Sequence, residues 1–192
     1  MTRPHFVQSK PSSHRVIEGG FFLVPHLANR DSVYSNSMNY RLYKPEDFEA
    51  VYGIEEVCFQ PPLTFGRRYM RWLVQAQNAA TWVAEDVGIL VGFAIIEWTQ
   101  AISEVTAYIQ TIEVLPELHG QGIGRELLKH MEGSALAVGA SSIWLHVDVE
   151  NAVAIRLYES HAFIRTGSEE NYYAPGRGAY LYRKSLLNST SG

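Results

Sequence analysis

The stretch Val114–Leu128, "VLPELHGQGIGRELL", decides the fold. Its three glycines stand between a strand-like segment and the amphipathic pattern of a helix, which we predict over residues 122–138. The apolar stripe of that helix consists of Ile123, Leu127, Met131 and Ala135. The first N–H groups of a helix lack partners within it and lie at the positive end of its dipole, and glycines let the backbone approach a ligand closely. The loop is therefore suited to bind a phosphate-bearing ligand.

Glycine-rich loops before helices also occur in nucleotide-binding domains, and some such loops merely turn the chain. A dinucleotide-binding fold predicts the glycines after an early strand, with an acidic residue at the end of the next strand. Here the glycines follow a late strand. A loop that binds a nucleoside triphosphate requires a lysine, and no lysine follows Gly124. The chain order thus disfavours both nucleotide alternatives, and clear binding of ATP or NAD would contradict this interpretation.

The composition is that of a globular domain, with 192 residues, 46% hydrophobic and 19% charged. A formal net charge of -4 gives no support to a nucleic-acid or membrane-surface role. The single cysteine, Cys58, excludes an intrachain disulfide and a cysteine-based zinc site, and we expect no metal. It is more typical of a small buried side chain than of a nucleophile. We expect a cytoplasmic protein without membrane partner, either monomer or homodimer.

The chain divides by composition into three parts. Residues 1–37 are rich in Ser, Asn, Gly and Pro, which predicts a partly mobile N-terminal extension. Residues 38–188 carry regular patterns and form the predicted domain, and residues 189–192 form a short tail.

The patterns predict one mixed α/β domain with the order β-α-α-β-β-β-α-β-α-β-β. The predicted strands cover residues 38–43, 80–86, 90–98, 104–115, 141–149, 162–167 and 179–186. The predicted helices cover residues 45–59, 66–77, 122–138 and 152–160, and Asn151 is suited to cap the last of them. Strand alternation puts Trp144, His146 and Asp148 on one face, opposite Ile143, Leu145 and Val147.

Two motifs with their spacing carry a resemblance to a known family. The segment "IEVLPELHGQGIGRELL" followed by "WLHVDVENAVAIRLYESHAF" resembles the GCN5-related N-acetyltransferase (GNAT) superfamily. The segment "NYYAPGRGAYLY" resembles the protein N-terminal acetyltransferases of the ribosomal-protein-alanine type. The resemblance covers about residues 38–187 and implies a GNAT fold, an N-acetyltransferase domain whose mixed central sheet contains splayed parallel strands. It also implies acetyl-CoA as co-substrate.

The resemblance implies roles for individual residues of the cofactor site. Backbone groups of Ile112, Glu113 and Val114 would pair with the pantetheine arm. The pyrophosphate would be held by the loop residues His119, Gly120, Gln121, Gly122, Ile123, Gly124 and Arg125. Asn151 would bond the cofactor where the parallel strands splay, and Tyr158 would lie beside the thioester sulfur. His119 departs from the usual Arg or Gln, and Ala162 replaces a usual glycine before Phe163, at a cost of roughly 1 kcal/mol if it is left-handed.

The implied chemistry is attack of an amine on a thioester. An ammonium must first lose a proton, and the leaving thiolate must gain one. Tyr158 is the candidate acid, although a tyrosine on that helix can also be a core residue. His146 is the candidate base; in the ribosomal-protein-alanine type a glutamate stands at its position, and a structural half-buried histidine is the equal alternative. Glu113 is the second candidate base, or a structural acid, and a backbone N–H on the strand ending at Val114 is the candidate oxyanion donor.

The acceptor site is predicted from the tyrosines near the C-terminus. Tyr172 and Tyr173 are expected in the last hairpin loop, facing the connection "FQPPLTFGRR" between the first two helices, where they could bind a peptide; they could also simply cover the sheet edge. Gly178 departs from the acidic residue that usually precedes the alanine. A protein or peptide N-terminal α-amine is the first expectation for the acceptor and a small-molecule amine the second. A catalytically silent acyl-CoA-binding domain is the third possibility.

Overall fold

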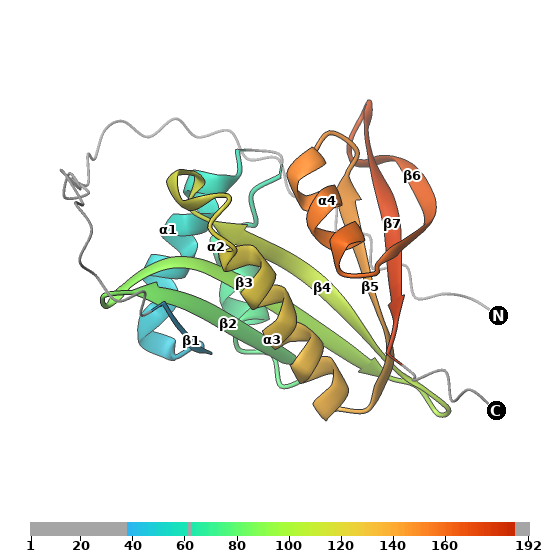
Figure 1. The fold of residues 1–192 in the computed structure, drawn as a ribbon, viewed down its shortest axis with the longest axis horizontal. Helices are drawn as coiled ribbons and strands as arrows, with labels where there is room; N and C mark the ends of the chain where they lie inside the picture. The colour runs from blue at the N-terminus through green and yellow to red at the C-terminus, as the bar shows by residue number, and fades with distance from the viewer. Residues whose placement is uncertain (1–37, 61–62, 187–192) are drawn as a thin grey trace.

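One seven-stranded sheet forms the centre of the molecule, with the strand order β1-β2-β3-β4-β5-β7-β6. The computed structural model describes residues 38–60 and 63–186, so the predicted extension and tail lie outside the described residues. All neighbouring strands are antiparallel except β4 and β5, which are parallel. Helices α3 and α4 cover one face of the sheet, and α1 and α2 cover the other (Figure 1). Within the described ranges, no helix is both long enough and apolar enough to cross a membrane.

The order of elements along the chain confirms the predicted order. The strands are β1 (Asn39–Leu42), β2 (Ala79–Asp86), β3 (Ile89–Gln100), β4 (Val105–Val114), β5 (Ala140–Asp148), β6 (Ile164–Ala174) and β7 (Arg177–Ser185). The helices are α1 (Phe48–Cys58), α2 (Arg67–Leu73), α3 (Ile123–Ala137) and α4 (Ala152–Ser160). Two short 3-10 turns, Pro45–Asp47 and Pro116–Leu118, precede α1 and α3.

The two largest differences from the predicted boundaries are at the ends of α2 and β6. Helix α2 ends at Leu73 rather than near residue 77, because the next bonds, Gln75 N–H to the Trp72 carbonyl and Ala76 N–H to the Leu73 carbonyl, close tighter turns that lead into β2. Strand β6 continues to Ala174, so Tyr172 and Tyr173 lie on the strand and the prediction of a loop position was wrong.

Two apolar cores pack against the opposite faces of the sheet. The predicted stripe of α3 is buried against the face of β5 that carries Ile143, Leu145 and Val147. On the other face α1 and α2 bury Phe48, Val51, Ile54, Met70 and Leu73 against Val83, Phe93 and Ile95. Because both faces are covered, a polar side chain near the middle of the sheet stays out of water unless the strands separate.

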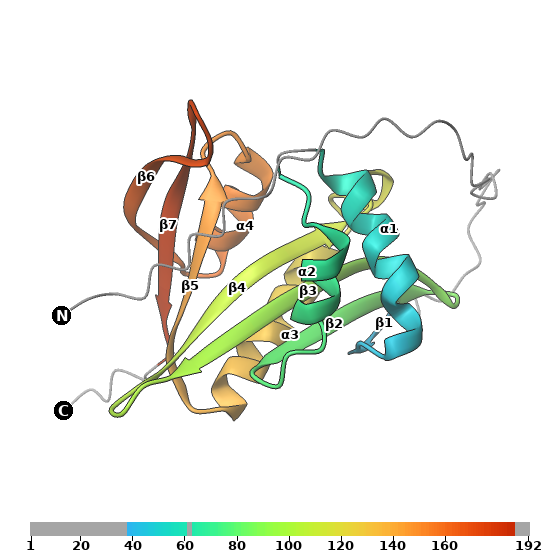
Figure 2. The ribbon, with the colours of Figure 1, turned by 180° about the vertical axis from the view of Figure 1, so that it is seen from behind.

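The strands separate between β4 and β5. Their parallel pairing runs from Val105 to Tyr108 on β4 and ends at Trp144 on β5, after which the two strands diverge (Figure 2). Beyond that point β4 keeps its bonds to β3 on one side and has an open edge on the other. The Leu115 N–H donates to the Val91 carbonyl on β3, so by alternation the backbone groups of Ile112 and Val114 point to the open edge.

A bulge in β4 decides which side chains face the divergence. Thr111 pairs with Ile95 and Ile109 pairs with Ile96, so Gln110 is an extra residue on β4. Strict alternation would put Tyr108 and Glu113 on opposite faces of the sheet. The extra residue places both on the face covered by α1 and α2.

Helix α4 is closed at both ends by local hydrogen bonds. The Asn151 side chain accepts a bond from the Ala154 N–H at 3.0 Å, which confirms the predicted cap. At the other end the Phe163 N–H donates to the Tyr158 carbonyl and the Ala162 N–H donates to the Glu159 carbonyl, both at 3.1 Å. This is a Schellman motif with an alanine at φ 62°, so the helix does end in the left-handed residue that the sequence disfavours.

We therefore expect Ala162→Gly to raise the free energy of unfolding by about 0.5–1 kcal/mol, because glycine removes the Cβ strain and loses part of that gain to its greater freedom in the unfolded chain. Chemical denaturation measures the change. The control is Arg156→Gly, at an exposed helical position of α4, which should lower the free energy of unfolding by about 1 kcal/mol. An Ala162→Gly protein no more stable than the parent would contradict the assignment of strain.

Candidate active site

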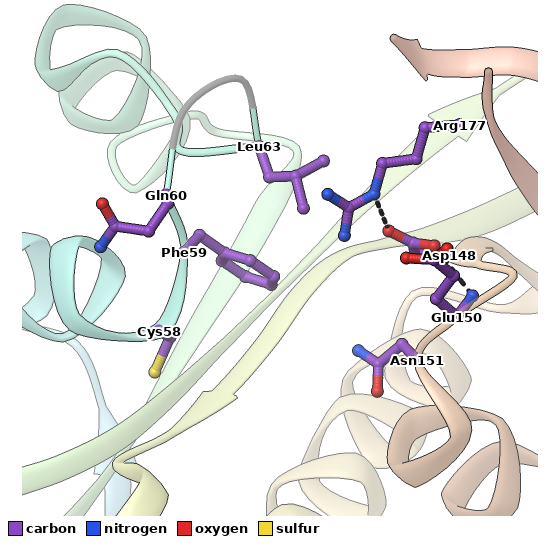
Figure 3. Close-up of a pocket in the computed structure, with 8 residues that line it drawn as sticks. All are labelled: Cys58, Phe59, Gln60, Leu63, Asp148, Glu150, Asn151 and Arg177. Atoms are coloured by element: carbon purple, nitrogen blue, oxygen red, sulfur yellow. Dashed lines mark hydrogen bonds and ion pairs between the residues drawn. The ribbon is translucent and has the colours of Figure 1, made fainter. Parts of the chain in front are cut away.

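A cavity of about 480 Å³ lies where the two parallel strands diverge. Its walls are the α1–α2 connection on one side and the ends of β5 and β7 with the start of α4 on the other (Figure 3). The lining residues are Cys58, Phe59, Gln60, Leu63, Asp148, Glu150, Asn151 and Arg177. The Arg177 guanidinium is held by the buried Asp148 carboxylate and faces Leu63 across the cavity. The divergence of β4 and β5 is thus a hollow with a mixed polar and apolar lining.

The glycine loop has the geometry of an anion cradle. Gly120 and Gly122 adopt positive φ angles of 79° and 84°, and a Cβ at either would meet nothing within 4 Å. They are therefore required for the backbone conformation and not for space. Gly122 is the N-cap of α3 and brings no side-chain acceptor to the amides of the first turn, where Arg125 is exposed. These amides fit a diphosphate.

Gly124 serves a different purpose from the other two glycines of the loop. It lies within α3, and a Cβ there would come within 3.6 Å of the Leu157 side chain and 4.0 Å of Ile112 and Val114. This glycine lets α3 lie close to both α4 and the open edge of β4. Close packing at this point keeps the loop next to the strand that would run beside the pantetheine arm.

The open edge of β4 ends in a carbonyl with two donors. The ring Nε2 of His119 donates to the Val114 carbonyl at 2.8 Å, and the Cys58 thiol donates to the same oxygen at 3.4 Å. Burial raises the pKa of the Cys58 thiol to about 12, so the thiol stays protonated at neutral pH and is a poor nucleophile. His119 therefore ties the start of the loop to the end of the strand.

Tyr158 is a nearly buried phenol. Tyr158 is 6% exposed, and its ring packs edge-on against that of Phe163 with the centroids 5.6 Å apart. Its hydroxyl makes no hydrogen bond to any described residue. Burial raises the pKa of Tyr158 well above its ordinary value, so the group carries its proton at neutral pH. The hydroxyl is thus available to donate to a ligand atom.

His146 lies in an aromatic cluster between β4 and β6. Its Nδ1 is 2.9 Å from the Tyr108 hydroxyl, and its ring stacks on Tyr172 with centroids 4.2 Å apart and planes at 9°. The Tyr173 hydroxyl donates to the His146 carbonyl at 3.3 Å. Burial lowers the pKa of His146, and the nearby Glu169 carboxylate opposes that effect. The imidazole is therefore neutral at neutral pH and can accept a proton.

The structure brings some of the predicted residues together and separates others. Tyr172 and Tyr173 contact His146, although from strand β6 and not from a loop. Glu113 lies away from this cluster: it is 2% exposed, accepts a bond from Thr111 at 2.7 Å, and its charge helps to raise the pKa of Cys58 on α1. That environment is typical of a structural acid.

Tyr108 was missed by the sequence analysis. It reaches His146 because β4 and β5 pair in a register that sets Tyr108 beside Trp144, two residues before His146. Its hydroxyl also lies 3.3 Å from that of Tyr172. The sequence did offer one signal, because Tyr108 lies on a strand that was already predicted to border the site. The register of two parallel strands cannot be obtained from one sequence, so the contact with His146 could not be predicted.

Comparison with known proteins shows the family to which the chain belongs. Residues 48–163 match the model of the acetyltransferase (GNAT) family. The [ribosomal protein bS18]-alanine N-acetyltransferase of Escherichia coli K12 is 34% identical over 134 residues, 66% of this chain and 81% of that protein. A crystal structure of the E. coli S18-alanine enzyme superposes with a TM-score of 0.68 at 25% identity, covering 80% of this chain and 97% of that one.

Two further relatives differ in acceptor. Arabidopsis thaliana Naa50, solved with a bisubstrate analogue of CoA and the peptide MVNAL, has a TM-score of 0.69 at 26% identity and covers 78% of this chain and 99% of its own. Streptothricin acetyltransferase of Streptomyces lavendulae is 37% identical over 97 residues, half of each chain. The chain belongs to the acetyltransferase (GNAT) family: it is an N-acetyltransferase, and acetyl-CoA is its co-substrate.

We expect Tyr158→Phe to lower kcat by about 10- to 100-fold while KM for acetyl-CoA changes little, because the hydroxyl has no partner in the protein and its removal leaves the packing intact. Steady-state kinetics with release of CoA measures both constants. The control is Tyr182→Phe, whose buried hydroxyl donates to Glu159 at 2.8 Å and which should lose stability but keep kcat. Equal kcat for the parent and Tyr158→Phe would remove Tyr158 from the chemistry.

Proposed function

We propose that this N-acetyltransferase acetylates the N-terminal α-amine of a protein or peptide. The observation that carries the proposal is the aromatic cluster of Tyr108, Tyr172 and Tyr173 around His146. Phenol groups on neighbouring strands can hydrogen-bond a peptide backbone and pack against its first side chain. The E. coli relative is named for acetylation of an alanine of ribosomal protein bS18, which supports a peptide that begins with alanine as the first acceptor to test.

The proposed cofactor contacts follow from the free backbone groups. The amides that open α3 and the side chain of Arg125 would hold the diphosphate, and the edge groups of Ile112 would pair with the pantetheine arm. The Val114 carbonyl is already bonded to His119 and Cys58, so its N–H is the group of Val114 that remains for the ligand. Asn151 uses its carbonyl oxygen for the cap of α4, so its amide N–H groups are the ones that remain for a ligand. Bound there, acetyl-CoA supplies an acetyl thioester to the acceptor amine.

The proposed chemistry assigns one task to each group. His146 takes the proton that the acceptor ammonium must lose, directly or through Tyr108 or a water. The N–H of Val114 points to the open edge of β4 and would stabilise the charge that develops on the acetyl oxygen. Tyr158 donates a proton to the leaving thiolate, a step its retained proton permits at neutral pH.

A small-molecule amine is the second candidate acceptor. The similarity to streptothricin acetyltransferase over half of each chain favours it. Both candidates use the same loop, open strand edge and tyrosine, so they differ in what the His146 cluster and the cavity admit.

The acceptor is tested with a panel of amines and the full chain. We expect a peptide beginning with alanine to give the highest kcat/KM, an N-terminally blocked copy of it to give background rates, and mass spectrometry to locate the acetyl group on the α-nitrogen. Turnover with small amines alone would support the second candidate. Binding of CoA without turnover on any acceptor would identify a silent acyl-CoA-binding domain.

The proposed role of His146 as the base is tested through the pH dependence of kcat/KM. The pKa of His146 is lowered from its ordinary value, so the group is neutral above that lowered pKa, and kcat/KM should fall as pH falls through it. His146→Glu places a carboxylate there, whose ordinary pKa near 4 should move this acid limb to lower pH. His146→Ala should lower kcat/KM and abolish the limb. An acid limb that persists in His146→Ala would assign the titration to another group.

A further inference from the structure

A base at His146 must lose its proton again after each turnover, and the ring itself has little access to water. Its side chain is 14% exposed, and the stacked Tyr172 covers one face of the ring. Solvent therefore reaches the imidazole poorly, and a proton on it needs a defined exit. The groups that face the imidazole are the hydroxyl of Tyr108 on β4 and, from β6, the ring of Tyr172 and the carboxylate of Glu169. The Tyr172 hydroxyl lies beside that of Tyr108, and the Tyr173 hydroxyl donates to the backbone carbonyl of His146.

Glu169 is the charged member of this set. One of its oxygens lies 3.4 Å from the Nε2 of His146, an ion-pair distance that is longer than a good hydrogen bond. The Glu169 side chain is 53% exposed, so the carboxylate touches both the enclosed ring and bulk water. Burial lowers the pKa of His146, and the Glu169 carboxylate acts in the opposite direction.

The two ring nitrogens contact different groups. Nδ1 faces the Tyr108 hydroxyl at 2.9 Å, and Nε2 faces the Glu169 carboxylate. A carboxylate can only accept, so the neutral ring places its N–H at Nε2 and accepts the Tyr108 O–H at Nδ1. The carboxylate thus selects the tautomer whose basic nitrogen is turned toward β4 and away from solvent.

On the basis of the proposed function, we infer that Glu169 is a positioning residue that orients His146 and provides the exit for its proton. When the acceptor amine gives a proton to the Tyr108 hydroxyl, that hydroxyl gives its own proton to Nδ1, and the ring becomes an imidazolium. The imidazolium then releases the Nε2 proton to the Glu169 carboxylate or to water held by it, which leaves the ring with its N–H at Nδ1. Once the product has left, Nδ1 returns its proton through Tyr108 to solvent and Nε2 takes a proton from the water at Glu169, so that Tyr108 and the starting tautomer are both restored. One proton enters from the amine and one leaves to solvent.

The charges of the cluster support this direction of transfer. An imidazolium surrounded by phenol rings is disfavoured by desolvation, and the negative charge of Glu169 offsets part of that cost. A carboxylate that holds one histidine tautomer and stabilises the cation formed during turnover has the same two tasks as the aspartate of a serine-protease triad.

The neighbouring acid, Glu170, supplies a matched control. It carries the same charge one residue along β6 and is exposed, and it makes no hydrogen bond or ion pair with His146, whereas the Glu169 carboxylate lies 3.4 Å from Nε2. Alternation along a strand turns successive side chains to opposite sides. Glu169→Gln and Glu170→Gln therefore each remove one negative charge from β6, but only Glu169→Gln removes the charge that lies beside the His146 ring.

The test compares Glu169→Gln, Glu169→Asp and Glu170→Gln. We expect Glu169→Gln to lower the pKa of His146, to move the acid limb of kcat/KM to lower pH, and to lower kcat about tenfold. Glu169→Asp should recover part of the loss, and Glu170→Gln should match the parent. Identical pH profiles and kcat values in Glu169→Gln and Glu170→Gln would overturn the inference.

An acceptor-independent measurement separates this inference from the proposed function. The pKa of His146 can be followed by NMR in the full chain, with His146→Gln used to assign its resonance. A lower pKa of His146 in Glu169→Gln and not in Glu170→Gln supports the pairing even if no peptide is acetylated. Peptide turnover with unchanged titration of His146 in all three variants would leave the proposed function intact and refute the role of Glu169.

Discussion

Beyond Tyr108 and Trp144 the parallel strands β4 and β5 no longer pair, and the arrangement of the site depends on this divergence. A continuous sheet would use the backbone groups of Ile112 and Val114 for its own ladder and would leave no cavity between the α1–α2 connection and α4. The divergence exposes strand edge in the middle of the domain, where a ligand can complete the ladder. Such an edge is stable because helices on both faces protect the rest of the sheet.

The glycine loop and the open edge act as one unit because α3 packs closely on β4. Gly124 allows that approach, and the bond from His119 to the Val114 carbonyl joins the loop to the strand end. A histidine therefore has a structural reason to stand at position 119, where the resemblance implied a side chain for the phosphates. The glycine at position 178 is likewise explained by packing, since a Cβ there would lie 2.8 Å from the Glu169 carbonyl oxygen and would push β6 away from β7.

The elements that repeat a pattern could be predicted from the sequence, and the irregular ones could not. Periodicity predicted α3 and the two faces of β5, and the residue type at position 151 predicted the cap of α4. The bulge at Gln110 has no sequence signature, yet it puts Tyr108 and Glu113 on the same face. A second irregularity, between Glu169 and Ala174, lengthens β6 and moves Tyr172 and Tyr173 from the expected loop to the strand. Tertiary pairing decides such features, and local propensity does not.

Helix α4 links the two proposed halves of the chemistry. Asn151 and Tyr158 are seven residues apart, about two turns, so they lie on one side of the helix and roughly 10 Å apart along its axis. A rigid helix would therefore fix the distance between the proposed cofactor contact of Asn151 and the proposed acid, Tyr158. The Schellman motif that closes on the Tyr158 carbonyl, with the Phe163 ring against the phenol, orients that end. The left-handed Ala162 is tolerated because these bonds and the ring contact outweigh its strain.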